Sequence, residues 1–251
     1  MTALSGRGLP RRIGRMSDQP APRFGAMTLD EFIGTLSSAT PSPGGGSASA
    51  VAAACGAALV AMVAALSTDR PKYAAYAGSH ARHGAAGREL AGRLMALADE
   101  DAAAYGAFAA ALKLPRETDA EKTARSTAIR AAARVAAEVP LRTLGACRDV
   151  VTAAEALAGR SNLNAASDLA VASRLAEAAA HGAAENVLVN LPSLADEALA
   201  GSMRDRVAAM LVETEELAEA TRAFVEGGEL REPAAAEPAA GAGSAAGGGG
   251  A

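Results

Sequence analysis

The sequence predicts an all-α protein, a single-domain bundle of six or seven helices. Half of the 251 residues are apolar, yet aromatic residues make up only 3% and tryptophan is absent, because alanine supplies most of the apolar share. Alanine is the strongest helix former and is depleted in strands. Apolar residues also recur at steps of three and four, and no segment alternates as a strand does. Abundant glycine and alanine let helices approach closely, which suits a helical dimer interface.

The chain divides into a folded middle and two ends without a core. Residues 1–27 form an arginine-rich leader that lacks the apolar stretch of a secretory signal, and we expect it to be disordered. Residues 28–226 carry the helical patterns and form one domain. Residues 227–251 are a Gly/Ala/Pro-rich tail, also expected to be disordered. The net charge of −4 and the scarcity of aromatic side chains argue against nucleic acid as a partner.

Capping residues place the first two helices. Thr28 and Glu31 form a capping box, which predicts a helix over Leu29–Leu36. After two prolines, Gly44-Gly45-Gly46-Ser47 leads into an alanine-rich helix, for which Ser47 is a candidate N-cap. Residues 44–68 contain no charge and are long enough to span a bilayer. Alanine adds little insertion energy, however, so we expect the buried central helix of a soluble bundle and no membrane partner.

Proline and glycine divide the rest of the domain. Pro71 fits the first turn of a helix that runs to Leu112, with an interruption near residues 84–87. Residues 117–137 form the next helix, and Pro140 begins another that Gly159 closes. Two further helices are predicted in the remaining sequence. They are Ala165–Leu188, entered by the turn Ser161–Asn164, and a last helix, capped by Ser193 with Asp196, that ends near Phe224.

Asp101 is the strongest candidate for catalysis. It continues the apolar stripe Leu90, Leu94 and Leu97, and Tyr105 follows it, so its carboxylate is expected to point inward. A buried carboxyl has a raised pKa, which suits proton transfer. The run Gly44–Ser47 precedes a helix N-terminus, where free N–H groups favour anions or polar ligand atoms.

Two further polar groups stand out. Asn162, Asn164, Ser167 and Asp168 form a dense cluster, which is more than a helix cap needs. Asn186 and Asn190 lie one turn apart in an apolar stretch, so we expect their amides to find partners across a helix interface.

The cysteines and histidines suggest no chemistry. Cys55 and Cys147 lie in apolar surroundings and are expected to be buried free thiols in a reducing, cytoplasmic compartment. His80, His83 and His181 form no metal-ligand set, so neither a metal nor another cofactor is expected.

Taken together, these motifs resemble the cyclodeaminase/cyclohydrolase family, which includes the C-terminal half of formiminotransferase-cyclodeaminase and stand-alone methenyltetrahydrofolate cyclohydrolases. The resemblance covers residues 28–226. In chain order it is carried by Thr40–Ser47 (TPSPGGGS), Gly56–Leu59 (GAAL), Asp99–Tyr105 (DEDAAAY), Lys113–Pro115 (KLP), Val139–Leu141 (VPL), Asn162 with Ser167 and Asp168, and Asn186–Asn190 (NVLVN).

The resemblance implies an all-helical homodimer with a folate site near the subunit interface, and no cofactor beyond the tetrahydrofolate that carries the substrate. It implies Asp101 as the catalytic aspartate, and we assign Asp168 to catalysis beside it. The substrate-binding residues are expected to be Gly44, Gly45, Gly46, Ser47, Lys72, Asn162, Ser167 and Asn190, with Lys122 or Arg125 as further partners for the glutamate carboxylates.

Three functions remain open at this point. The first is a cyclohydrolase, a C–N hydrolase that interconverts 5,10-methenyl- and 10-formyltetrahydrofolate. The second is an ammonia-lyase, a cyclodeaminase that closes 5-formiminotetrahydrofolate and releases ammonia. The third is a helical dimer that binds folate without turnover. We favour the cyclohydrolase because the chain carries no transferase half.

Overall fold

The computed structural model describes residues 23–233, and all regular secondary structure in this part is helical, without a strand. The predicted all-α class and helix count are confirmed. The α-helices are α1 (Leu29–Leu36), α2 (Gly45–Ser67), α3 (Ala77–Leu112), α4 (Asp119–Leu157), α5 (Ala166–Asn190) and α6 (Glu197–Gly227). Four short 3₁₀-helices, η1 (Phe24–Ala26), η2 (Pro71–Tyr76), η3 (Leu163–Ala165) and η4 (Leu191–Leu194), link or precede them.

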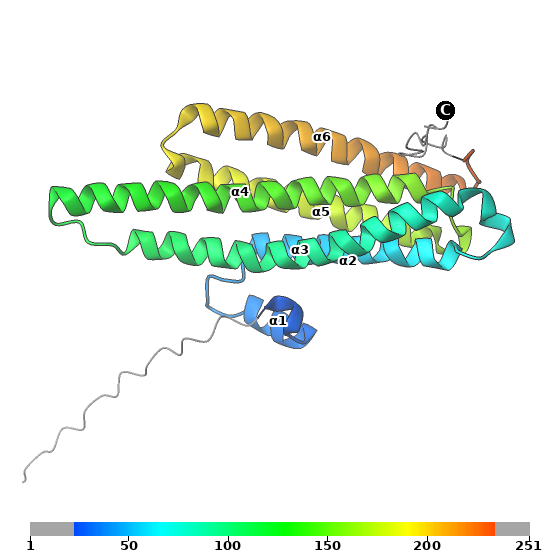
Figure 1. Ribbon diagram of the computed structural model, residues 1–251, viewed down its shortest axis with the longest axis horizontal. Helices are drawn as coiled ribbons and strands as arrows, with labels where there is room; N and C mark the ends of the chain where they lie inside the picture. The colour runs from blue at the N-terminus through cyan, green and yellow to red at the C-terminus, as the bar shows by residue number, and fades with distance from the viewer. Residues whose placement is uncertain (1–22, 234–251) are drawn as a thin grey trace, which may run out of the picture.

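Four helices, α2 to α5, form an elongated bundle (Figure 1). α2 packs against α3 and α5, and α4 packs against the same two helices from the other side. α6 covers α4 and α5, while the short α1 lies beside the bundle next to α2 and α3. One continuous core runs between the helices, and its largest fully buried side chains include Leu94, Leu144, Leu157 and Leu169.

Helix α2 approaches its neighbours at glycines. A Cβ on Gly87 of α3 would lie 2.7 Å from the carbonyl oxygen of Ala57 and 2.9 Å from the amide nitrogen of Ala61. A Cβ on Gly56 would lie 2.9 Å from the carbonyl oxygen of Ala172 on α5. The backbones are therefore in direct contact on both sides of α2, and only residues without a side chain fit at these crossings.

The outward side of α2 is apolar. We call it the outer stripe, and none of its residues is fully buried: Ala48, Val51, Ala52, Cys55, Ala58, Leu59, Met62, Ala65 and Leu66. By length and composition α2 is the described helix that is apolar enough to cross a membrane. The prediction of a buried central helix holds for one side of α2 only. The prediction that Cys55 is buried is wrong, because an alanine-rich sequence does not reveal which side faces a neighbour; Cys147 is buried.

The helix starts follow the sequence closely. The capping box of Thr28 and Glu31 is present and opens α1 at the predicted residue. Thr118 and Glu121 form a second capping box at the start of α4. Asp196 caps α6 through the backbone N–H of Leu199, whereas Ser193 lies in η4.

Two predicted interruptions are absent, because α3 and α4 are continuous. The glycines near residues 84–87 serve the contact with α2 and do not break α3. Pro140 lies inside α4, where it has no N–H to donate to the carbonyl of Ala136 four residues earlier. The side-chain amide of Asn190 donates to that carbonyl at 3.0 Å instead. A partner on another helix therefore satisfies the group that the proline leaves open.

Both ends of the described chain are tied to the bundle. The backbone N–H of Phe24 donates to Asp99 at 2.8 Å, and the Phe24 ring packs against Phe32. Beyond α6, Arg231 pairs with Glu155 at 2.8 Å, and its backbone N–H donates to the carbonyl of Gly159. Residues 23–27 and 228–233, assigned to the leader and tail from sequence, thus lie against the bundle. The remaining leader and tail lie outside the described residues.

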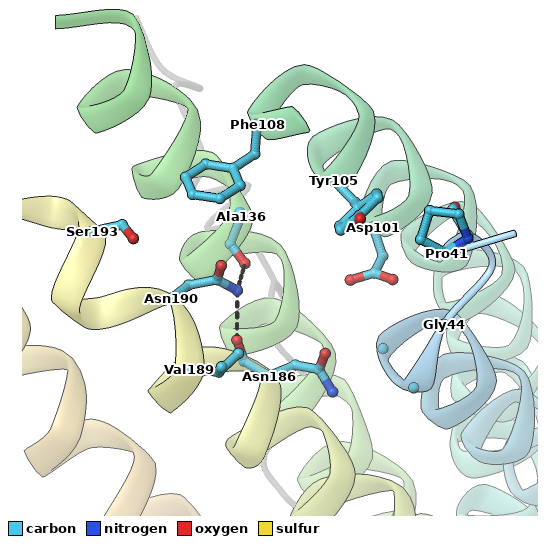
Figure 2. Close-up of a pocket in the computed structure, with 13 residues that line it drawn as sticks. Pro41, Gly44, Asp101, Tyr105, Phe108, Ala136, Asn186, Val189, Asn190 and Ser193 are labelled. Atoms are coloured by element: carbon cyan, nitrogen blue, oxygen red, sulfur yellow. Dashed lines mark hydrogen bonds between the residues drawn. The ribbon is translucent and has the colours of Figure 1, made fainter. Parts of the chain in front are cut away.

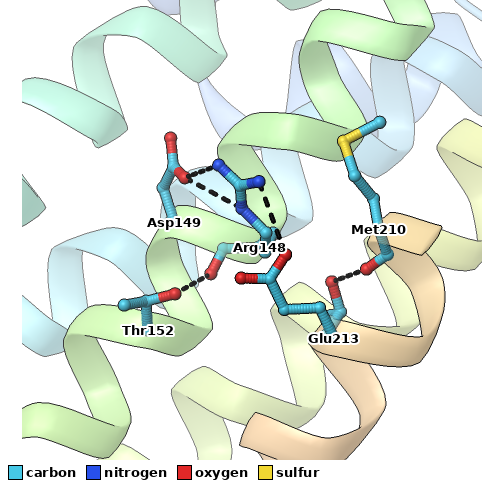
Figure 3. Close-up of polar contacts among 6 residues, drawn as sticks. Arg148, Asp149, Thr152, Met210 and Glu213 are labelled. Atoms are coloured by element: carbon cyan, nitrogen blue, oxygen red, sulfur yellow. Dashed lines mark hydrogen bonds and ion pairs between the residues drawn. The ribbon is translucent and has the colours of Figure 1, made fainter. Parts of the chain in front are cut away.

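An ion-pair network joins α6 to α4 at the surface. Arg148 on α4 contacts Asp149 at 2.8 Å and Glu213 on α6 at 3.5 Å (Figure 3). All three side chains are partly exposed, so the network adds little free energy of folding. The burial of Met203, Val207 and Ala218 holds α6 in place.

The contact of Gly87 with α2 predicts that glycine-to-alanine substitutions at two positions of α3 change the free energy of unfolding in opposite directions. Gly87→Ala forces a methyl group into the backbone of α2 and is expected to lower the free energy of unfolding by about 1–3 kcal/mol. Gly92→Ala, in the same helix with open space around it, is expected to raise it by about 0.5–1 kcal/mol. Urea unfolding of both variants measures this, and equal effects would contradict the close contact.

Candidate functional site

A cavity of about 370 Å³ lies at the N-terminal end of α2 (Figure 2). Its walls come from the loop before α2 and from α2 to α5 and η4. The residues that line it are Pro41, Ser42, Gly44, Gly45, Gly46, Asp101, Tyr105, Phe108, Ala136, Asn186, Val189, Asn190 and Ser193. Several predicted site residues from separate parts of the chain therefore meet at one place, and the volume suits a drug-sized ligand.

Asp101 of α3 faces this cavity, as the apolar stripe predicted. Its Oδ2 accepts a hydrogen bond from the Ser47 hydroxyl at 2.9 Å. Burial raises the pKa of the Asp101 carboxyl above its ordinary value, and the hydrogen bonds from the side chain and backbone of Ser47 only partly oppose this. The site thus holds a carboxyl group that takes up a proton more readily than a carboxyl in water.

The glycine run brings the start of α2 next to this carboxyl. A Cβ on Gly46 would lie 2.3 Å from Oδ1 of Asp101, so no other residue fits there without moving the carboxyl group. Gly44 is the N-cap of α2. The free N–H groups of the first turn therefore point toward the cavity end of the helix, where they favour an anion or a ligand oxygen.

Ser47 has a different role from the N-cap that the sequence suggested. It lies within the first turn of α2, is fully buried, and its hydroxyl is within hydrogen-bond distance of both the Ala98 carbonyl and Asp101. Helix α2 begins at Gly45 because Gly44 adopts the extended backbone that an N-cap requires. Ser47 thus connects α2 to α3 and holds the Asp101 carboxyl in place.

The wall opposite α2 carries the two amides of α5. Asn190 donates to the carbonyl of Ala136 on α4, so the expected hydrogen bond across a helix interface is confirmed for this residue. Asn186 donates to Gly182 within its own helix, at 2.7 Å. Figure 2 shows Asn186 and Asp101 facing each other across the cavity.

Sequence reasoning did not assign Asn186, Tyr105 or Phe108 to the site. Tyr105 and Phe108 supply the apolar part of the wall from α3 (Figure 2). The sequence spacing could have identified two of them. Tyr105 follows Asp101 by one helical turn and Asn186 precedes Asn190 by one turn, so each lies on the same helix face as an assigned residue.

The second predicted cluster lies at the other end of α2. The backbone N–H of Asn162 donates to Ser67 at 2.8 Å, and its amide donates to the carbonyl of Leu66. Lys72 lies in η2, at the same end. Helix α2 has 23 residues, so about 34 Å of helix separates the two ends. Within one chain the structure does not bring Asn162, Ser167, Asp168 and Lys72 to the cavity.

The remaining charged candidates and His80 do not line the cavity. Lys122 pairs with Asp119, and Arg125 donates to the carbonyl of Leu112, both at the α3–α4 hairpin. His80 is buried and bonds to the carbonyl of Arg160. Among residues 23–233 no three His, Cys, Asp or Glu side chains form a group that could hold a metal ion.

The raised pKa of Asp101 predicts how stability depends on pH. Because the folded protein holds this proton more tightly than the unfolded chain, the contribution to the free energy of unfolding is full below the ordinary pKa of 3.8. It is lost as the pH rises through the raised pKa. Asp101→Asn stays neutral at every pH. Urea unfolding is therefore expected to give the variant a higher free energy of unfolding than the native protein at about pH 7, and this difference is expected to be smaller at about pH 4. A difference that is the same at both values would contradict the raised pKa.

Known proteins are similar to this chain. The sequence model of the formiminotransferase-cyclodeaminase family matches residues 28–209. A methenyltetrahydrofolate cyclohydrolase from Methylorubrum extorquens is 37% identical over 189 residues, which cover 75% of this chain and 91% of the relative. The formimidoyltransferase-cyclodeaminase of Sus scrofa is 34% identical over 185 residues, and the match spans 74% of this chain but about a third (34%) of that longer protein.

A solved structure agrees with the fold. The crystal structure of formiminotetrahydrofolate cyclodeaminase from Thermotoga maritima superposes with a TM-score of 0.74 at 27% sequence identity, covering 81% of this chain and 98% of the other. The family match covers residues 41–193, the segment that builds the Asp101 cavity. The chain therefore belongs to the formiminotransferase-cyclodeaminase family.

Proposed function

We propose that the protein is a methenyltetrahydrofolate cyclohydrolase, which interconverts 5,10-methenyl- and 10-formyltetrahydrofolate. The observation that carries the proposal is the Asp101 carboxyl, held in a cavity at a helix N-terminus with a raised pKa. The similarity to the Methylorubrum cyclohydrolase, 91% of which this chain covers, supports it.

The chemistry requires one group that both accepts and donates a proton. Water adds to the methenyl carbon between N5 and N10 and loses a proton, which gives a tetrahedral carbon. The bond from this carbon to N5 then breaks while N5 takes up a proton, and the carbon remains on N10 as a formyl group after loss of its hydroxyl proton. Asp101 is the group that takes the proton from water and returns it to N5. Because burial raises its pKa, Asp101 takes up a proton more readily than a carboxyl in water does, and it can then return that proton to N5.

A second reaction is supported by the relative of known structure. The Thermotoga protein is a formiminotetrahydrofolate cyclodeaminase, and its fold covers most of this chain. In that reaction N10 attacks the formimino carbon and ammonia leaves, so the same carboxyl would protonate the departing nitrogen. A folate-binding dimer without turnover is the third reading. An assay of turnover separates the three.

Substitution of Asp101 tests the proposal. Asp101→Asn is expected to reduce the hydrolysis rate of methenyltetrahydrofolate by about 100-fold or more, because the amide cannot carry the proton. Loss of the methenyl absorbance measures the rate. Glu100→Gln is the matched control, because Glu100 is the neighbouring acid, lies at the surface and pairs with Arg142.

The native protein decides the reaction class in the same experiment. Hydrolysis by the native protein no faster than the spontaneous rate would contradict the cyclohydrolase, and ammonia release from formiminotetrahydrofolate would then identify the cyclodeaminase. Full activity of Asp101→Asn would contradict the role of this carboxyl.

We infer that two copies of the chain pair through the outer stripe of α2. The stripe is uncharged and exposes Met62 and Leu66 to about two fifths of their surface (39% and 41%). An antiparallel pair of α2 helices, centred near residue 56, places the Gly44–Ser47 end of one copy beside the Ser67 end of the other. The cluster of Asn162, Ser167 and Asp168 would then lie beside the Asp101 cavity of the partner copy. This arrangement accounts for a site whose predicted residues are divided between two ends of one helix.

Cys55 reports this pairing because it lies in the outer stripe, next to the proposed centre. Mild oxidation is expected to give a Cys55–Cys55 cross-linked dimer that a reductant reverses. Cys147 serves as an internal control, since burial raises the pKa of its thiol to about 12 and keeps it unreactive. Cys55→Ser is expected to remove the cross-link. Sedimentation of the native protein as a monomer would contradict the dimer.

A further inference from the structure

The amide oxygens of Asn186 and Asn190 have a fixed direction, because the main chain occupies their amide nitrogens. The amide nitrogen of Asn190 donates to the carbonyls of Ala136 and Asn186, at 3.0 and 2.7 Å. An amide nitrogen has two hydrogens, so both are used. Rotating the amide by a half-turn would set its oxygen against two carbonyl oxygens, which repel it. The Asn190 side chain can therefore present only its oxygen to a ligand.

A proline holds Asn190 in this orientation. The Ala136 carbonyl lacks its partner within α4 because Pro140 has no N–H. A buried carbonyl without a hydrogen-bond donor destabilises the folded protein. The Asn190 amide supplies this donor, and its orientation is fixed by the bond. Pro140, predicted from the sequence to begin a new helix, thus fixes the orientation of Asn190 in the cavity wall.

Asn186 is oriented in a similar way. Its amide nitrogen donates to the carbonyl of Gly182 at 2.7 Å and lies 3.5 Å from the position of a Cβ on Gly45. The nitrogen side therefore packs against the protein. In Figure 2 the oxygen of Asn186 points to the side of the cavity where Asp101 lies. Within residues 23–233 no hydrogen bond reaches the side-chain oxygen of Asn186, and none of the buried side-chain polar atoms lacks a partner, so this oxygen is open to the cavity.

Two oxygens that only accept hydrogen bonds select a ligand that donates them. Side chains one helical turn apart have Cβ atoms about 5–6 Å apart, so both can reach one flat ring. The pterin ring of tetrahydrofolate carries neighbouring N–H donors, the 2-amino group and N3–H. We propose that the side-chain oxygens of Asn186 and Asn190 accept hydrogen bonds from this donor edge and select the ring. The inference rests on the proposed folate substrate and holds equally for either reaction.

The two asparagines are then specificity residues, and Asp101 keeps the proton transfer. A ring without the 2-amino group would leave an acceptor in the cavity without a donor, which weakens binding far more than the loss of contact area. The apolar wall of Tyr105 and Phe108 lies beside the amides and can cover the face of the ring.

Equilibrium binding of two ligands to matched variants tests the inference. The ligands are tetrahydrofolate and an analogue in which a methyl group replaces the 2-amino group, each titrated by calorimetry under reducing conditions. The native protein is expected to prefer tetrahydrofolate by about 10-fold or more, the equivalent of one lost hydrogen bond. Asn186→Leu, which keeps the side-chain size, is expected to reduce this preference to less than about 3-fold. Glu185→Leu, the same replacement at an exposed position of the same helix that does not line the cavity, is expected to keep the native preference.

The outcomes separate the inference from the function on which it rests. If the native protein binds tetrahydrofolate and Asn186→Leu keeps the full preference, the asparagine oxygens do not select the pterin ring. The proposed folate site would be unaffected by that result. If the native protein does not bind tetrahydrofolate, the proposed function is wrong, and the inference fails with it. Asn190→Leu is expected to act like Asn186→Leu. Should it unfold through loss of its bonds to the backbone, Asn186→Leu decides alone, because its hydrogen bond lies within α5.

Discussion

The close backbone contact of α2 with α3 and α5 is the constraint on which the rest of the structure depends. Gly87 and Gly56 let the helices meet with almost no side chain between them. At the N-terminal end of α2 the same closeness, at Gly46, sets the Asp101 carboxyl of α3 against the first turn. A larger residue at Gly87 or Gly46 would push α3 away from α2, and one at Gly56 would push α5 away from α2. The glycines therefore determine both the packing of the bundle and the position of the Asp101 carboxyl.

The chemistry follows from placing one carboxyl against a helix that has no charge of its own. Helix α2 offers Asp101 no basic partner, only the hydroxyl and backbone of Ser47. Burial then outweighs the hydrogen bonds, so the pKa of Asp101 rises. A nearby arginine would instead have lowered the pKa of this carboxyl and held it ionised. The uncharged composition of α2 thus has two consequences: tight packing against α3 and α5, and a carboxyl that holds its proton more tightly than a carboxyl in water.

The cavity also shows how an apparent defect in a helix can be used. Pro140 removes a hydrogen bond from α4, and the vacant carbonyl of Ala136 orients Asn190 from α5. The outer stripe of α2 gives a comparable case on a larger scale. Its exposed apolar residues are unfavourable in a single copy, and an antiparallel pair would bury them while joining the two separated polar clusters. Both features make sense only when the neighbouring element is considered.

The sequence by itself determined the helical class, the caps at Thr28 and Asp196, and the inward direction of Asp101, because these depend on residues within a few turns of one another. It also determined the family, since the motifs are read in order along one chain. Only the tertiary structure decided that α3 and α4 continue through Gly87 and Pro140, because partners on other helices compensate at both places. It likewise decided that Cys55 is exposed, and that Asn162 lies at the opposite end of α2 from Asp101. Local spacing reveals which side of a helix a residue occupies, but not which neighbour, if any, covers that side.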